Sequence, residues 1–209
     1  MAHEKNGSRW YDGFWYSLLI DPLAGGSFAR PVLRMVPENS SAIDIGCGTG
    51  ALVLALSGKC SHVTGVDLSR KMTAFGQKRL RDRSIPNAEI ICMPATELAS
   101  TLKRKYDFAV MTQILHEVPA ETRDRVIEEA KKIAGKFIIA DFLSPYPETW
   151  PGRFVRLIEK SAGREHNANF KDWVARGGID AFLEKHGLRV MEERIFSTGA
   201  GKIVMAVSS

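Results

Sequence analysis

Short apolar stretches that alternate with helix-forming stretches dominate the middle of the chain. Five of them are predicted to be strands, at 41–45, 62–66, 88–93, 106–112 and 136–142. Each stretch is mostly apolar and does not alternate strictly between apolar and polar residues, which is typical of strands that are buried on both faces of a parallel sheet. Helices are expected between them, one of them with Ser69 as its N-cap. This pattern predicts an α/β fold in which helices cover both faces of the sheet.

The alternation stops after residue 142, and the rest of the chain has a different organisation. Helices with polar breaks are expected over 150–187, followed by two strands whose connecting turn at 198–201 is short enough to force an antiparallel hairpin. We therefore predict one domain over 1–209, a doubly wound, mostly parallel seven-stranded sheet with a C-terminal antiparallel hairpin. Its parts are an N-terminal helical lid (1–40), a core (41–142), a helical lid segment (150–187) and the hairpin (188–209).

Composition excludes several classes of protein. The 209 residues are 44% hydrophobic, enough to form a core without a disulfide or metal staple. With 29 Lys and Arg against 24 Asp and Glu, the net charge of +5 permits an anionic ligand without requiring one. Three cysteines without a C-x-x-C pair indicate neither a disulfide framework nor a zinc site. No apolar run is long enough to span a membrane, and residues 1–9 do not resemble a signal peptide, so a cytoplasmic protein is expected.

A glycine-rich turn follows the first predicted strand, in the sequence Asp44-Ile-Gly46-Cys47-Gly48-Thr-Gly50. Glycines between a strand and a helix let the backbone turn sharply and approach a ligand closely. The next strand ends at Asp67, whose carboxylate can accept hydrogen bonds from both hydroxyls of a ribose. Both features fall at the carboxyl ends of strands, so a nucleoside-containing ligand is expected there. Gly46, Gly48 and Ala51 also fit a relaxed dinucleotide-binding pattern, which leaves a nicotinamide cofactor open.

These residues also carry a family resemblance. The segment 44–50 resembles the first motif of class I S-adenosylmethionine-dependent methyltransferases, and 65–69 resembles their second. Residues 106–119 resemble the segment around their fourth strand, and the C-terminal hairpin is similar to theirs. Within that superfamily, the chain is most similar to small-molecule methyltransferases of the ubiquinone and menaquinone biosynthesis type. That likeness includes the pair Tyr11-Asp12.

The resemblance implies S-adenosylmethionine as cofactor and assigns residues to it. Asp67 would bind the ribose and Leu68 would pack on adenine, while Asp44 would meet the methionine amino group. Where the family often has an Asp near adenine, this chain offers only the backbone of Ala95 or the hydroxyl of Thr96. The implied cofactor-binding set is Tyr11, Asp44, Gly46, Cys47, Gly48, Gly50, Asp67, Leu68, Ala95, Thr96 and Gln113.

Methyl transfer from a sulfonium is an in-line displacement, and it needs a base only if the acceptor arrives protonated. His116 and Glu117 follow the fourth strand and are the predicted catalytic residues. Asp141, at the end of the fifth strand, is also expected to point to the edge of the site. All three have a structural interpretation as well: His116 bound to backbone, Glu117 a solvated carboxylate, and Asp141 a cap for the following turn. Only Glu117 and Asp141 offer carboxylates, so no metal is expected. Four polar residues, Glu165, His166, Asn167 and Asn169, are read as turn residues that can contact the acceptor.

A small-molecule methyl acceptor is the expected partner. The alternatives are an RNA methyltransferase, a nicotinamide-dependent oxidoreductase and a binding module without turnover. The basic run 78–83 reads as a solvated helix face, so nucleic acid is not the expected partner. The acceptor atom and the oligomeric state are not predicted.

Overall fold

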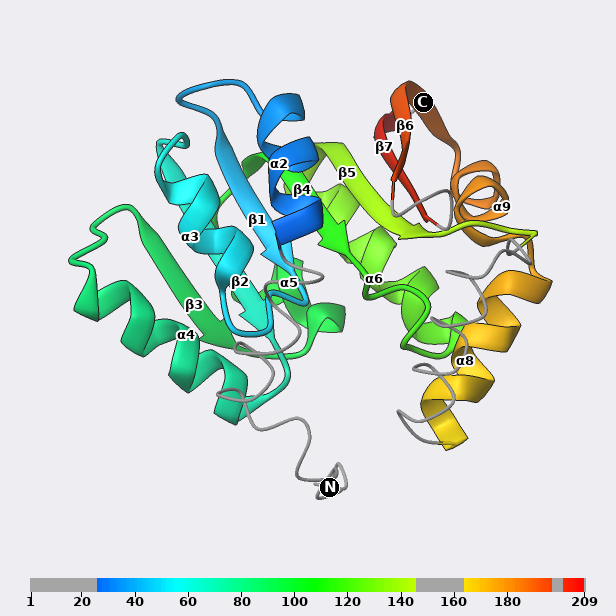
Figure 1. Cartoon of the computed structure of the whole chain (residues 1–209), viewed down its shortest axis with the longest axis horizontal. Helices are drawn as coiled ribbons and strands as arrows, with labels where there is room; N and C mark the ends of the chain where they lie inside the picture. Colours follow the sequence, from blue (N-terminus) through cyan, green and yellow to red (C-terminus); the bar gives the residue numbers. More distant parts are fainter. Residues whose placement is uncertain (1–25, 146–163, 197–200, 209) are drawn as a thin grey trace.

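The computed structural model describes residues 26–145, 164–196 and 201–208. Its strands form one seven-stranded sheet in the order β3-β2-β1-β4-β5-β7-β6 (Figure 1). The strands are β1 (Ser41–Ile45), β2 (His62–Asp67), β3 (Ala88–Cys92), β4 (Tyr106–Thr112), β5 (Ala134–Phe142), β6 (Leu188–Phe196) and β7 (Gly201–Ser208). Strands β1 to β5 pair in parallel, and β7 pairs antiparallel with both β5 and β6. The predicted fold class is therefore confirmed.

Helices cover both faces of this sheet (Figure 1). One face carries α2 (Gly26–Met35), α3 (Ala51–Ser57) and α4 (Arg70–Asp82). The other carries α5 (Leu98–Thr101), α6 (Ala120–Ile133), α8 (Arg164–Ala175) and α9 (Gly178–Lys185). Alternate residues of strand β4 pack on opposite faces of the sheet. Phe108 and Val110 belong to one buried cluster, and Ala109 and Met111 belong to the other. Ser69 caps α4 as predicted, accepting a hydrogen bond from the backbone N–H of Met72.

The helices outside residues 41–142 pack on the sheet. In α2, Val32 and Met35 are buried against α3 and the sheet, so this part of the segment 1–40 covers a sheet face. In α8 and α9, Trp173 and Phe182 join the core of the opposite face. Residues 1–25 and 146–163, which include Tyr11, lie outside the described residues.

The order of the strands reverses between β1 and β4. The chain moves from β1 outward to β2 and β3, then returns to place β4 on the other side of β1. In sheets of this kind, ligands bind in the crevice outside the carboxyl ends of the strands at the point of reversal. The loops that follow β1, β2 and β4 all lie at that edge. Within the described part of the chain, every helix is too short or too polar to cross a membrane.

Candidate cofactor and acceptor site

The glycine-rich loop after β1 has a backbone conformation that side chains would not allow. Gly46 and Gly50 have φ angles of 77° and 74°, in the left-handed region that favours glycine. A Cβ on Gly46 would lie 2.6 Å from Cδ1 of Ile114, and one on Gly50 would lie 2.4 Å from Cδ1 of Ile90. These two positions thus need glycine for both conformation and space. At Gly48 the nearest atom to an added Cβ would be Sδ of Met72, 3.7 Å away.

Asp67, at the end of β2, is fixed by the same loop. One carboxylate oxygen accepts the N–H of Gly48 at 2.9 Å, and the other accepts the N–H of Ser69 at 2.8 Å. Burial raises the pKa of Asp67, and these backbone hydrogen bonds oppose that shift. A carboxylate has about four acceptor positions, so each oxygen can still accept a hydroxyl. Beside it, Leu68 is 73% exposed, an unusual exposure for a leucine at a strand end.

Two buried polar atoms in the crevice have no hydrogen-bond partner among the described residues. They are Oδ1 of Asp44, on β1, and Nε2 of Gln113, directly after β4. Burial and the nearby charge of Asp67 raise the pKa of Asp44 from 3.8 to about 7. Gln113 holds a φ of 57°, which is uncommon for a residue with a side chain. Since buried polar groups are nearly always paired, these two atoms point to a ligand.

The remaining predicted cofactor residues line the loops at the same edge. Cys47 is buried, and its backbone N–H donates to the carbonyl of Val66 at 3.0 Å. Its carbonyl accepts the N–H of Gly50 at 2.9 Å, and burial raises the pKa of its thiol, so the thiol stays neutral. Ala95 and Thr96 are half-buried in a single 3-10 turn after β3. The position of that turn, beyond Asp67, is compatible with an adenine.

His116 is held by a buried carboxylate on the neighbouring strand. Its Nδ1 lies 2.8 Å from Oδ1 of Asp141, and the two side chains are 2% and 1% exposed. Asp141 also accepts the backbone N–H groups of Leu115, His116 and Phe142. Because a carboxylate oxygen accepts, Nδ1 of His116 donates, and Nε2 carries the lone pair of the neutral ring. Asp141 therefore positions His116 and does more than cap a turn.

Glu117 and His166 lie beside His116. The ligand atoms of the three residues lie within 4.8 Å of one another. The rings of His116 and His166 meet edge to face, with centroids 5.5 Å apart and planes at 86°. Sequence analysis placed residues 165–169 in a turn, and this was wrong: they belong to α8, which begins at Arg164. The structure thus brings His166 to both predicted catalytic residues.

Arg123, which the sequence analysis missed, connects these elements. It is 3% exposed and donates to the carbonyl of Leu115 at 2.6 Å, to the carbonyl of Asn169 at 2.8 Å and to Asp172 at 2.8 Å. Its guanidinium also lies 5.3 Å from the ring centroid of Trp173. The signal was present in the sequence: Arg123 stands three and four residues before the apolar positions 126 and 127 of α6, on the buried face of that helix.

Comparisons with known proteins point to a methyltransferase domain. A family model described as "Methyltransferase domain" matches residues 42–135. A ubiquinone biosynthesis O-methyltransferase of Acinetobacter baumannii is 28% identical over 100 residues, covering 48% of this chain and 38% of that relative. The human tRNA (uracil-5-)-methyltransferase homolog A is 27% identical over 143 residues, covering 68% of this chain and 23% of that one. The chain thus spans well under half the length of either relative.

A solved structure supports the fold over most of the chain. Magnesium protoporphyrin IX methyltransferase from Synechocystis PCC 6803, with bound S-adenosylhomocysteine, superposes with a TM-score of 0.59 at 19% identity. The match covers 87% of this chain and 80% of that one. Residues 42–135 of this chain therefore form a domain of the methyltransferase family, within a class I methyltransferase fold that continues through β7.

Proposed function

We propose that the chain transfers a methyl group from S-adenosylmethionine to a small-molecule acceptor. The observation that carries this proposal is the pair of buried, unpartnered atoms, Oδ1 of Asp44 and Nε2 of Gln113, beside Asp67 in the crevice. An amino acid end needs one acceptor and one donor, and these atoms supply one of each. A raised pKa of Asp44 also fits a site that is completed by a cationic ligand.

The nucleoside end fits the residues that follow β2 and β3. Asp67 would accept both ribose hydroxyls, and the exposed face of Leu68 would be covered by adenine. Thr96 and the backbone of Ala95 would meet the edge of the base. When bound, S-adenosylmethionine supplies a methyl carbon that its positively charged sulfur activates. The chain then needs to exclude water and to hold the acceptor in line with that carbon, about 3–3.5 Å away.

His116 and Glu117 are proposed to serve the acceptor. Nε2 of His116 faces the cluster with Glu117 and His166, and it can take the proton of an acceptor hydroxyl or ammonium. Asp141 keeps the ring in the tautomer that this step requires. Tyr11, predicted to lie at the cofactor, stays a prediction because it falls outside the described residues.

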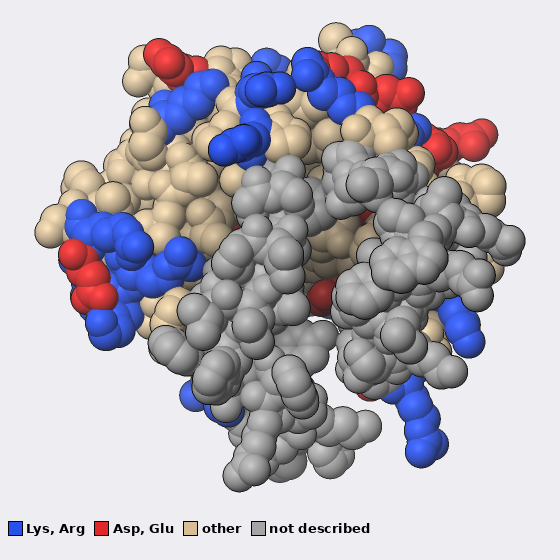
Figure 2. Space-filling view, in the orientation of Figure 1, with Lys and Arg blue, Asp and Glu red and all other residues tan. Residues whose placement is uncertain are grey.

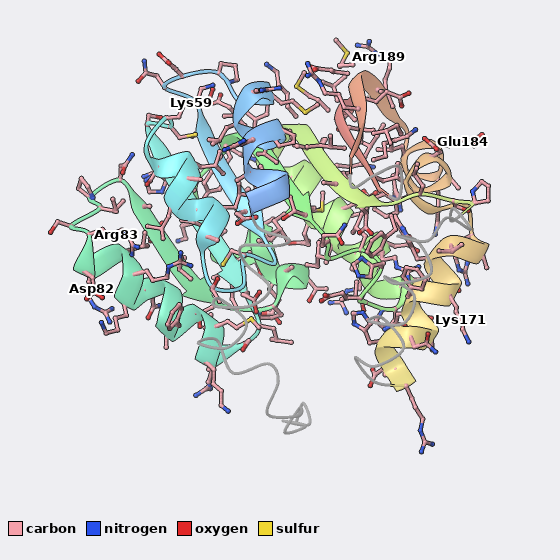
Figure 3. The ribbon with its side chains drawn as sticks, in the orientation of Figure 1. Lys59, Asp82, Arg83, Lys171, Glu184 and Arg189 are labelled. Carbon is pink, nitrogen blue, oxygen red and sulfur yellow. The ribbon has the colours of Figure 1, made fainter. Side chains whose placement is uncertain are left out.

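A small-molecule acceptor agrees better than RNA with the distribution of charge. Helix α4 begins at the carboxyl edge of the sheet and runs back toward the amino edge, so Arg81 and Arg83 lie toward its far end, whereas Arg79 reaches back to donate to Thr49 of the glycine-rich loop. Figure 2 shows Lys and Arg gathered at the left of the molecule, over α4. In Figure 3, Arg83 lies on the opposite side of the view from Lys171 on α8. RNA remains the second candidate because of the tRNA methyltransferase homolog.

The cofactor half of the proposal is tested by calorimetry with S-adenosylhomocysteine. Wild-type protein should bind at one site, and Asp67→Ala should weaken binding by about 100-fold, since two hydrogen bonds to a charged group are lost. Asp82→Asn is the matched control, because Asp82 lies at the exposed end of α4 and should leave affinity unchanged (Figure 3). Undetectable binding to wild-type protein, or equal binding to Asp67→Ala, would overturn the proposal. NADH in place of S-adenosylhomocysteine tests the oxidoreductase alternative.

The acceptor class is tested with a radiolabelled methyl donor. Small phenols, catechols, amines and thiols are offered in parallel with total RNA. Label transferred to a small molecule supports the proposal. Label transferred to RNA alone, in a reaction slowed by charge reversal at the exposed Arg81 and Arg83, would replace it with the second candidate.

A further inference from the structure

The structure places two imidazoles and one carboxylate together on the acceptor side of the crevice. We infer that His116, Glu117 and His166 form a binding site for a divalent transition-metal ion. Their ligand atoms lie within 4.8 Å of one another. Around an ion with bonds of about 2.0–2.2 Å, neighbouring ligand atoms lie roughly 3–3.5 Å apart. Glu117 is exposed and His166 is half-buried, so small side-chain rotations close this difference.

The hydrogen bonding of His116 is the arrangement that metal-binding histidines show. A ligating histidine almost always donates its other ring N–H to a carboxylate or carbonyl, which fixes the tautomer. Here Nδ1 of His116 lies 2.8 Å from Asp141, whose own oxygens are held by backbone N–H groups. Nε2 is thereby left as the nitrogen that binds an ion. The arrangement is buried and preorganised before any ion arrives.

The third ligand is held on the same framework although it comes from a distant helix. Arg123 joins the carbonyl of Leu115, next to His116, to the carbonyl of Asn169 on α8. The side chain of Asn169 in turn donates to the carbonyl of Glu117 at 2.7 Å. Asn169 of α8 is therefore linked to the loop after β4 at two points, through Arg123 to Leu115 and directly to Glu117. This fixes the backbones of all three ligand residues relative to one another.

The kind of ion follows from the ligand types. Two imidazoles with one carboxylate suit Zn²⁺, Fe²⁺ and Co²⁺, whereas Mg²⁺ and Ca²⁺ prefer all-oxygen sites. Three protein ligands leave at least one coordination position open, as in sites where a metal acts on a substrate. The sequence analysis expected no metal because it considered only the carboxylates of Glu117 and Asp141 as ligands. His166 could not be counted because its position next to His116 depends on how α8 packs.

The site deepens the proposed function by naming the acceptor chemistry. The open position would take an acceptor hydroxyl or similar donor atom, and the ion would lower the pKa of that group. In this form His116 would hold the ion and would not take a proton; the acceptor group, its pKa lowered by the ion, would release its proton to solvent water. The acceptor assignment rests on the proposed function, whereas binding of the ion does not.

Metal binding is tested on untagged, full-length protein that has been stripped with a chelator. Co²⁺ is titrated while visible absorption is recorded, and Zn²⁺ binding is measured by calorimetry. One ion per chain is expected. Glu117→Gln and His166→Asn should each weaken binding by at least about tenfold, the lower end of the range for the outer partners of metal ligands. Thermal melts check that both variants are folded, and the exposed Glu117 keeps the test open if His166→Asn unfolds.

Matched controls separate this site from adventitious binding. Glu165→Gln removes the same charge from the residue next to His166, and His62→Asn removes an imidazole at the start of β2; both should bind Co²⁺ like wild type. Lack of saturable binding, or equal binding by all four variants, would overturn the site. S-adenosylhomocysteine is titrated separately without metal. If it binds while no ion does, the metal site fails and the proposed function stands; the reverse result supports the site and overturns the function.

Discussion

The two halves of the crevice satisfy their buried polar groups in opposite ways. The half built on β1 and β2 leaves Oδ1 of Asp44 without a partner, and Nε2 of Gln113 at its border is likewise unpaired among the described residues. The half built on β5, α6 and α8 pairs its buried groups internally, with Asp141 and Arg123 each making at least three hydrogen bonds. The first half is thus completed by a ligand, whereas the second is complete as a scaffold and presents side chains from it.

This difference predicts that substitutions in the two halves of the crevice affect different measured properties. The half with unpaired buried groups is stabilised most by binding a ligand. Each unpaired buried polar group destabilises the folded protein by about 1–3 kcal/mol until a ligand forms a hydrogen bond to it. A half with internally paired groups keeps its geometry with or without a ligand. Variants in the first half should therefore change affinity for the cofactor, and variants in the second should change stability or turnover.

The largest effect is expected from Arg123→Leu. The change leaves the buried carbonyl of Leu115 without its donor and removes the bonds to Asn169 and Asp172, so the free energy of unfolding should fall by about 3 kcal/mol. Urea denaturation measures this. Arg176→Leu is the control: Arg176 bonds the same Asp172 from an exposed position and should leave the free energy of unfolding almost unchanged. Equal effects of the two variants would contradict the assignment of Arg123 to the scaffold.

The next effect concerns Asp141→Asn. An amide in this position presents a donor where His116 needs an acceptor, so the ring loses its fixed tautomer. Methyl transfer to the acceptor found in the screen should slow by about 10- to 100-fold, with the affinity for S-adenosylhomocysteine unchanged. Asp107→Asn, at the exposed start of β4, is the control for both measurements. A loss of cofactor affinity in Asp141→Asn would mean that the two halves are not separate.

The pH dependence of cofactor binding tests the first half. Burial raises the pKa of Asp44 from 3.8 to about 7, and a cationic amino group requires the ionised form. Binding of S-adenosylhomocysteine should therefore tighten by about tenfold between pH ~6 and pH ~8, following the ionised fraction. Calorimetry should show proton release on binding at pH ~6.5. Asp44→Asn should bind weakly and should lose this pH dependence.

The same shift has the opposite sign for stability. The folded protein holds a proton on Asp44 at pH values where the unfolded chain has released it. Stability from the protonated form is thus present below pH ~4 and is lost as the pH rises toward ~7. Asp44→Asn should remove this part of the pH dependence, and an unchanged profile in the variant would contradict the raised pKa.

The smallest effect is expected from Leu68→Ala. Leu68 is 73% exposed, so its truncation should change stability by less than about 0.5 kcal/mol. If adenine covers this side chain, S-adenosylhomocysteine should bind about fivefold more weakly, from roughly 1 kcal/mol of lost apolar contact. Val190→Ala, at an exposed position of β6, serves as the control. Equal affinities of wild type and Leu68→Ala for S-adenosylhomocysteine would contradict the proposal that adenine packs on Leu68.

The sequence predicted the first half of the crevice better than the second, and the reason is physical. The loop after β1 and the position of Asp67 follow from local features. These are the end of a strand and a run of glycines, the residue that best tolerates the left-handed backbone of this loop. The neighbours of His116 depend instead on packing between residues far apart in the chain. Periodicity predicts that α8 is apolar on one side, but it does not say which loop its first turn will meet. His166 and Arg123 were missed as partners for that reason.

The link between Arg123 and Asp172 spans 49 positions of sequence. During synthesis, the strands and loops that surround Asp44 and Asp67 have emerged once β4 and the loop that follows it are made, whereas the contacts between His116 and His166 must wait for α8. The part of the crevice proposed for the methyl donor is thus encoded earlier in the chain than the part proposed for the acceptor, which is completed only when α8 has been made.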